Sequence, residues 1–199
     1  IAVPGEHADT KRVRVIGLIP DQVVTEHLLK SIPVRDGQMT SFVDKDILKI
    51  AVVERHKGTG NVGLGFIHGF GLKRGALAGS VGHDAHNLTV VGCDDVSMLT
   101  ATRAVAEMGG GLVAADGEAI LAAVALPIAG LMSDKAVEVV RAEMDRLVGV
   151  AHELGSPLHD PLMTLGFMAL EVIPSLKLTD QGLVDVDKFS LVSLWANEE

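Results

Sequence analysis

The chain has 199 residues, a formal net charge of −9 and an apolar fraction of 48%, so its length fits one domain with a large core. Because aromatic residues make up only 3%, that core must be mainly aliphatic. The negative charge and the scattered basic residues disfavour nucleic-acid binding, and the single cysteine excludes an internal disulfide and a multi-cysteine zinc site.

Strands are predicted first along the chain. Residues 12–18 alternate basic and apolar side chains at first, which is the period of a half-buried strand. Residues 47–54 are β-branched and nearly all apolar, which predicts a strand covered on both faces. Residues 76–80 and 88–91 are short apolar runs that we also interpret as strands. Asp116-Gly117, between the apolar runs 112–115 and 119–126, predicts a hairpin.

Two helices are predicted between and after these strands. Asp95 can cap a helix that runs to about Met108, before Gly109. Ser133 can cap a longer helix that ends at Gly155. Residues 163–186 hold only short apolar runs, which leaves their structure open. The sequence therefore predicts a single α+β (mixed α/β) domain, in which two main helices pack on one or two sheets.

A glycine-rich segment matches the dinucleotide-binding pattern G-x-G-x-x-G at Gly58, Gly60 and Gly63. That pattern needs a helix whose first amides face a pyrophosphate. Here further glycines follow in "LGFIHGFG", where the helix would have to be. We therefore favour a close-packed, glycine-lined turn over a nucleotide site.

The stretch "SVGHDAHN" places His83, Asp84, His86 and Asn87 between two strand-like runs. A loop there could aim both histidines at one ion or ligand, or it could be a structural turn closed by Asp84 and Asn87. A zinc hydrolase needs three protein ligands, and nothing in the sequence brings His56 or His68 near the pair. The spacing leaves both alternatives open.

Two nucleophile hypotheses are weaker. Cys93 could pair with His86, but a buried thiol at the end of a strand is the commoner case. Ser80, His83 and Asp84 are too close in sequence for the geometry of a hydrolase triad, so we reject a triad.

The sequence also makes predictions about membrane association, the N-terminal segment and the surface of the domain. No apolar run reaches the roughly 18–20 residues of a membrane-spanning helix, so we expect no membrane partner. The first residues lack Met and the pattern of a signal peptide, and we expect a piece of a longer protein in which residues 1–11 connect to a domain of residues 12–199. The high apolar fraction suggests that another subunit or domain covers part of the surface.

Several segments together resemble the C-terminal domain of bacterial adenine deaminases, in the amidohydrolase superfamily. They are "ILKIAVVERHKGTGNVGLGFIHGFGLKRGALAGSVGHDAHNLTVVG", "MGGGLVAADGE", "LPIAGLMSD" and "DPLMTLGFMALEVIPSLKLTDQGLVDV". The resemblance runs from about Arg12 to Val186 in order. It departs at Ala85, where the family often has serine, and at Glu171, where it often has proline. The missing hydroxyl at position 85 argues against a hydrogen bond donated from that side chain.

The resemblance implies hydrolytic deamination of adenine to hypoxanthine and ammonia in a cytoplasmic homodimer or other homo-oligomer. A divalent metal (Mn, Fe or Zn) in a (β/α)₈ barrel would activate the water, and neither that barrel nor its His-x-His ligands occur in this chain. We therefore expect no catalytic or metal-binding residue here, no cofactor bound by this segment, and no activity from it alone.

The resemblance also makes six residues candidates for lining the substrate pocket or the interface with the barrel: Arg55, His56, His83, Asp84, His86 and Asn87. The alternative function is a non-catalytic assembly or dimerisation module, and a weaker alternative is a stand-alone metal-binding protein.

Overall fold

The computed structural model describes residues 1–3 and 9–196, and this part of the chain is a mixed α+β domain as predicted. Its α-helices are α1 (Asp95–Glu107), α2 (Val137–Glu153) and α3 (Pro161–Phe167), and its short 3₁₀ helices are η1 (Val43–Lys45) and η2 (Val186–Lys188). Its strands are β1 (Thr10–Leu18), β2 (Thr25–Pro33), β3 (Ile47–Val53), β4 (Val62–His68), β5 (Ala76–Gly79), β6 (Leu88–Gly92), β7 (Gly111–Asp116), β8 (Ala119–Ala125), β9 (Leu176–Thr179), β10 (Gly182–Asp185) and β11 (Ser190–Val192).

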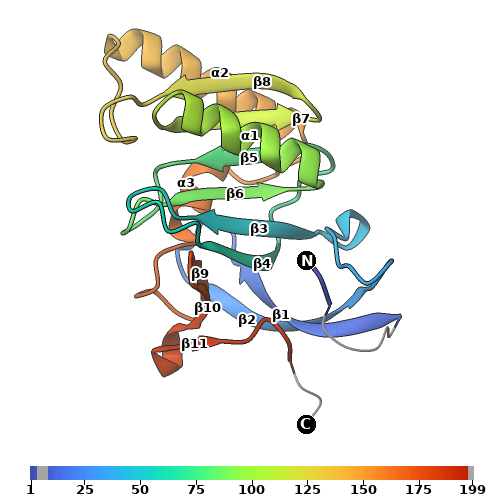
Figure 1. Cartoon of the computed structure of the whole chain (residues 1–199). Coiled ribbons are helices and arrows are strands. Elements are labelled where there is room, and N and C mark those ends of the chain that lie inside the picture. The colour runs from blue at the N-terminus through green and yellow to red at the C-terminus, as the bar shows by residue number, and fades with distance from the viewer. Residues whose placement is uncertain (4–8, 197–199) are drawn as a thin grey trace.

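The strands form two sheets (Figure 1). The large sheet has the order β2-β1-β4-β3-β6-β5-β7-β8, and the small sheet has the order β11-β10-β9. Within the large sheet, β1 and β4 run parallel and the other neighbours run antiparallel. The four strands and the Asp116-Gly117 hairpin predicted from the sequence are confirmed. Strand β2 was not predicted, because as an edge strand it buries little more than its two ends and shows no clean alternation.

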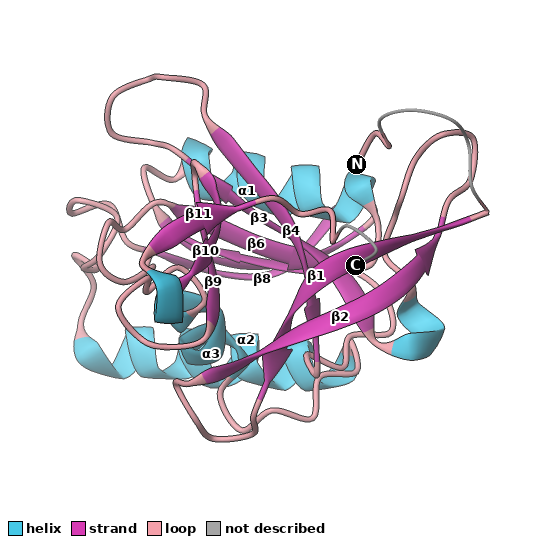
Figure 2. Cartoon of the chain, turned by 90° about the horizontal axis from the view of Figure 1, so that it is seen from below, coloured by secondary structure: helices cyan, strands magenta, loops and turns pink. Residues whose placement is uncertain are grey.

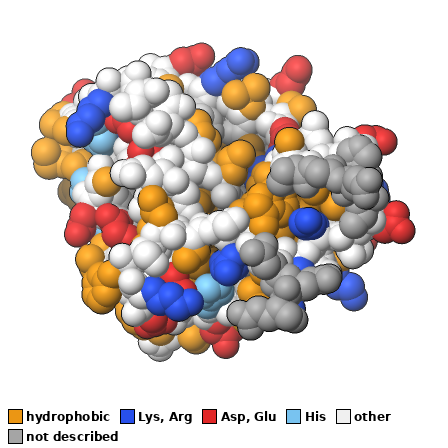
Figure 3. Space-filling view, turned by 60° about the horizontal axis from the view of Figure 1, so that its bottom comes forward, with side chains coloured by type: hydrophobic (Ala, Val, Ile, Leu, Met, Phe, Trp, Pro, Cys, Tyr) orange, Lys and Arg blue, Asp and Glu red, His pale blue; other side chains and the backbone are white. Residues whose placement is uncertain are grey.

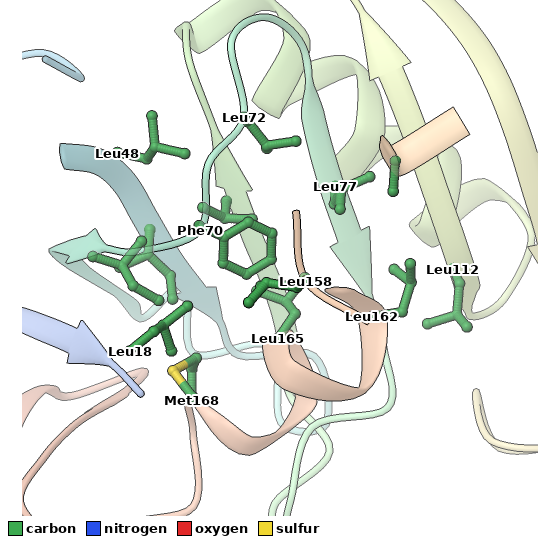
Figure 4. Close-up of a cluster of buried hydrophobic side chains, with 14 of the residues drawn as sticks. Leu18, Leu48, Phe70, Leu72, Leu77, Leu112, Leu158, Leu162, Leu165 and Met168 are labelled. Atoms are coloured by element: carbon green, nitrogen blue, oxygen red, sulfur yellow. The ribbon is translucent and has the colours of Figure 1, made fainter. Parts of the chain in front are cut away.

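Helices cover both faces of the large sheet (Figure 2). Helix α1 contacts β5, β6, β7 and β8 on one face, and α2 and α3 pack on the other. Alanines fill the layer beneath α1, where their small side chains let helix and strands approach closely. The opposite face is mainly leucine, isoleucine and valine, and Figure 4 shows the ring of Phe70 beside Leu158 and Leu165. Strand β3 is buried along almost its whole length, as its apolar run predicted.

The glycine-rich segment does not form a nucleotide-binding loop, and only part of it is closely packed. The predicted absence of a helix is confirmed, because the residues after Gly60 form strand β4. Gly58 and Gly60 lie in an open turn with positive φ, where an added Cβ would meet no atom within 4 Å, so close packing was a wrong expectation there. Gly63 is different: a Cβ on it would lie 1.9 Å from the carbonyl oxygen of Thr179. The small sheet therefore packs directly on the backbone of β4.

Both helix caps predicted from the sequence are wrong. Asp94, not Asp95, is the N-cap of α1: its carboxylate accepts hydrogen bonds from the backbone N–H of Ser97 at 2.8 Å and from the Ser97 hydroxyl at 2.7 Å. Asp95 instead forms an ion pair with Lys49. Helix α2 begins at Val137, and Ser133 lies in the preceding loop, where its hydroxyl accepts from the N–H of Lys135.

Replacing Asp94 by alanine should lower the free energy of unfolding by about 0.5–2 kcal/mol, because the first turn of α1 loses its capping acceptor. The matched control is Ser133→Ala, which should change this free energy by less than about 0.5 kcal/mol. Chemical denaturation of both variants measures the difference. Equal losses would contradict the assignment of the cap.

The C-terminal end of the described chain pairs with the edge of β1, and the N-terminal end pairs with residues 37–39. Ile1 exchanges backbone hydrogen bonds with Met39, and Trp195 forms an isolated bridge with Val13. Together they cover a small apolar cluster that includes Val15 and Phe66. Among the helices of the described residues, none has both the length and the apolarity needed to cross a bilayer.

Candidate functional site

Three loops meet at one end of the large sheet, on the left in Figure 1. They are loop 54–61 between β3 and β4, loop 80–87 between β5 and β6, and loop 126–136 between β8 and α2. All six candidate residues lie on the first two of these loops. We call loop 80–87 the histidine loop.

Arg55 ties the three loops together. Its Nε donates to the carbonyl oxygen of His86 at 2.6 Å, and its Nη2 donates to the carbonyl oxygen of Ala129 at 2.8 Å. Its backbone N–H donates to the side-chain oxygen of Asn87 at 3.4 Å. A guanidinium group has several donors in one plane, so a single side chain can hold carbonyls from two separate loops.

Small residues make this junction possible. The guanidinium of Arg55 lies directly on Gly130, where a Cβ would come within 2.7 Å of Nη2. The buried hydroxyl of Ser80 donates to the carbonyl oxygen of Gly130 at 2.6 Å and accepts from the N–H of Gly111 at 2.8 Å. Ser80 therefore fixes the backbone, which agrees with the rejection of a catalytic triad.

Asn87 is buried and connects the histidine loop to the small sheet. Its side-chain amide donates to one carboxylate oxygen of Asp180 at 3.2 Å, and the amide of Asn61 donates to the other oxygen at the same distance. Asp180 lies in the turn between β9 and β10. Asn87 thus bonds outside its own loop, whereas the structural alternative predicted that it would close a turn within it.

The loop that carries Arg55 and His56 folds around Glu54. The Glu54 carboxylate accepts hydrogen bonds from the backbone N–H groups of His56, Lys57 and Thr59 and from the Thr59 hydroxyl. These hydrogen bonds lower the pKa of Glu54 to about 2, and the bond from the backbone N–H of Thr59 has the largest effect. His56 is exposed, and its Nε2 lies 2.7 Å from the carbonyl oxygen of Ala85. Because a carbonyl oxygen can only accept, Nε2 is the donor of this hydrogen bond.

His83 is held by α3. Its backbone N–H donates to the carbonyl oxygen of Gly166 at 2.9 Å, and its ring stacks on Phe167 with 4.9 Å between ring centres. His83 also lines a mostly apolar pocket of about 90 Å³ with Met144, Leu162 and other side chains. Sites for small organic ligands usually enclose about 300–1,000 Å³, so this pocket by itself is smaller than such a site.

His86 is the second ring of the loop and lies edge-on to His83, with 5.7 Å between ring centres. Its backbone is left-handed, with φ 51°. Burial lowers the pKa of His86, and the neighbouring His83 and Arg55 lower it further. Among the described residues, no group bonds its buried Nδ1. This Nδ1 therefore lacks a hydrogen-bond partner among the described residues, and it is also shielded from solvent.

The geometry gives less support to a metal site or to a cysteine nucleophile. Within residues 1–3 and 9–196, no three His, Cys, Asp or Glu side chains come together as they would around a metal ion. His56 does lie next to the histidine loop, which the sequence did not indicate, but it contacts a carbonyl. Asp84 is exposed at the tip of the loop. Burial raises the pKa of Cys93 to about 12, so a thiolate nucleophile is disfavoured at neutral pH.

Comparison with known proteins decides the family. The sequence profile of the adenine deaminase C-terminal domain matches residues 22–190. The chain belongs to this family. Curated relatives include adenine deaminases from Desulfatibacillum aliphaticivorans (57% identity over 188 residues), Methanothrix thermoacetophila (54% over 183) and Brucella anthropi (47% over 186). These alignments cover 94%, 92% and 94% of this chain, but only 33%, 32% and 33% of the relatives.

The adenine deaminase C-terminal domain thus spans about one third of the length of these relatives, and the matched range contains all six candidates. The structure brings these six residues to one end of the domain. It also adds partners that sequence reasoning missed, among them Ser80 as a backbone clamp, Gly130, Phe167 and Asp180. No local pattern could have identified them, because Asn87 and Asp180 are 93 residues apart in the chain.

Proposed function

We propose that this chain is the C-terminal domain of an enzyme that hydrolyses adenine to hypoxanthine and ammonia, and that its histidine loop lines the substrate pocket where the domain meets the rest of the enzyme. Adenine deaminase is the name of the relatives, and the matched family carries the same name. The observation that carries the proposal is a small pocket of about 90 Å³, which His83 lines together with Asp160 and apolar side chains, next to His86, whose buried Nδ1 has no partner among the described residues.

The chemistry of the loop suits a purine. Adenine is a flat heteroaromatic ring with nitrogen acceptors and an amino donor, and enzymes that deaminate nucleobases hold the base by hydrogen bonds and by stacking. The stacked pair of His83 and Phe167 offers an aromatic wall, and the imidazole of His86 offers one donor or acceptor. Arg55 keeps the loop in place without using a side-chain nitrogen of either histidine.

The described residues do not fit the divalent metal that the family implies, because no three suitable ligands come together. When bound elsewhere in the full-length protein, such a metal supplies hydroxide near neutral pH. We place it, whether Mn, Fe or Zn, in the two thirds that lie outside this chain. This domain alone is then inactive, and its part is to bind and enclose the substrate.

Substitution of the histidines in the full-length enzyme tests the proposal. His83→Ala and His86→Ala should each lower kcat/KM for adenine at least about tenfold, which is about 1.4 kcal/mol, with the bound metal unchanged. His83→Phe keeps an aromatic ring against Phe167 and so preserves the proposed aromatic wall, and it should lose less activity than His83→Ala. His152→Ala is the matched control, because His152 lies at the far end of α2 and should leave the kinetics unchanged.

Each other outcome contradicts the proposal in its own way. Lower melting temperatures with wild-type kinetics would mean that the loop is a structural turn, which favours the assembly-module alternative. An equal loss of kcat/KM in His83→Phe and His83→Ala would refute the aromatic wall as the role of His83. Loss of bound metal would place a histidine in the ligand shell.

A further inference from the structure

Phe189 is the most unusual apolar side chain on the surface. It is 86% exposed, although the chain has only five phenylalanines, and Phe66 and Phe70 are completely buried. Its backbone is left-handed, with φ 50° and ψ 43°. This conformation is costly for a residue with a Cβ and a bulky side chain. Phe189 therefore contributes little to the core while occupying a strained position.

The same local structure occurs a second time, which makes a direct comparison possible. Val43-Asp44-Lys45 forms η1 and is followed by Asp46 with φ 50° and ψ 42°, just as Val186-Asp187-Lys188 is followed by Phe189. Asp46 tolerates the left-handed conformation and accepts hydrogen bonds from two glycine N–H groups. At the equivalent position, Phe189 only points outward. An outward aromatic ring needs an explanation outside the described residues.

The turn that presents Phe189 is rigidly held. The buried carboxylate of Asp185 caps η2 by accepting from the N–H of Lys188 at 3.2 Å. The same carboxylate lies 3.2 Å from the Lys188 ammonium and 3.5 Å from Nδ1 of His27 on β2. A side chain that is fixed before binding loses little entropy when it is covered, and rigid aromatic residues are typical anchors of protein interfaces.

Phe189 borders an open groove of about 320 Å³ that lies next to the β9–β10 turn, which also contacts the histidine loop. Exposed Val172 and Leu191 lie along it, and Thr179 and Gln181 line its other end. Asp180, between these last two residues, is the partner of Asn87 in the histidine loop. The β9–β10 turn is thus shared by the groove and the site. Figure 3, with the bottom of Figure 1 turned forward, shows hydrophobic side chains among charged ones on this face.

We propose that the surface formed by Phe189, Leu191 and Val172 docks against the part of the full-length protein that lies outside this chain. The relatives are about three times as long as the matched region, so the remaining two thirds of such a protein are a large partner within the same polypeptide. The inference rests on the proposed function in one respect: the histidine loop faces that same part. Because residues of the β9–β10 turn line the groove and Asp180 of that turn bonds the histidine loop, the two surfaces are neighbours that one partner can cover.

Photocrosslinking in the full-length protein tests this docking. The photoreactive residue p-benzoylphenylalanine replaces Phe189, and mass spectrometry maps the crosslinks. We expect crosslinks within one chain, to residues N-terminal of the region matched here. The same probe at Ile120, which is 53% exposed on edge strand β8 away from the small sheet, should give at least tenfold fewer crosslinks. Crosslinks between two chains, or none at all, would overturn the proposal.

A second variant separates docking from folding and from activity. Phe189→Asn removes the ring, and asparagine accepts the left-handed backbone, so the domain should stay folded. Hydrogen exchange of the amides of residues 188–192 should then speed up at least tenfold in the full-length protein, and Ile120→Asn should leave them unchanged. Unchanged exchange in Phe189→Asn would overturn the docking surface. If the photoreactive variant crosslinks as expected but the wild-type protein does not deaminate adenine, the proposed function alone is refuted.

Discussion

Replacing Gly63 by alanine should lower the free energy of unfolding by about 3 kcal/mol or more. A Cβ at this position would lie 1.9 Å from the carbonyl oxygen of Thr179, and that oxygen belongs to the backbone of the small sheet. A backbone atom cannot turn aside as a side chain can, so the two sheets would have to separate. Overpacking in a well-filled core typically costs 1–3 kcal/mol, and a clash between two backbones belongs at the upper end or beyond it.

The matched control for this prediction is Gly149→Ala. Gly149 lies inside α2, with no atom within 4 Å of a Cβ position. Alanine favours the helix by about 1 kcal/mol over glycine, so this variant should be as stable as the wild type or more stable. Urea denaturation compares the two variants. Similar stabilities for Gly63→Ala and Gly149→Ala would refute the close approach of the sheets.

The second large effect concerns Lys177, a completely buried lysine on β9. Its ammonium donates to the carbonyl oxygens of Val23 at 2.7 Å and of Phe167 at 3.2 Å. Burial lowers its pKa to about 8 in the folded protein, against 10.5 for a free lysine. Between these two pH values the unfolded chain binds more protons than the folded chain, so the free energy of unfolding should rise with pH.

Each pKa unit corresponds to 1.36 kcal/mol, so the rise should approach about 3 kcal/mol from below pH 8 to above pH 10.5. Lys177→Met has no such proton and should show a flatter dependence in this range. Lys45→Met, at an exposed lysine, should keep the slope of the wild type. Denaturation at several pH values tests all three proteins. A slope in Lys177→Met equal to that of the wild type would disprove the buried charge.

Lys177 also links the core to the candidate site. Phe167, whose carbonyl it binds, is the last residue of α3 and carries the ring on which His83 stacks. The position of His83 thus depends on a strand almost a hundred residues further along the chain. Such a dependence is a matter of tertiary packing, and it cannot be read from the spacing of the histidines.

The sequence by itself determined the local features of this domain. The apolar run of β3 predicted burial on both faces, Asp116-Gly117 predicted a hairpin, and the glycines after Gly60 excluded a nucleotide-binding helix. These signals depend on neighbouring residues only, through backbone conformation and side-chain periodicity. Strand β2 gave no such signal because few of its residues are buried, and α3 gave none because its seven residues are too short a run to show a helical period.

The tertiary structure decided which residues meet. Asp94 and Asp95 are chemically alike, and only the backbone angles of the folded chain show that Asp94 caps α1. The sequence pointed to the histidine loop, but left open whether it is a turn or a site. Its geometry comes from Arg55, Gly130 and Asp180, which lie on other loops. Contacts between segments so far apart in the chain depend on how the sheets and helices pack, so sequence spacing does not contain them.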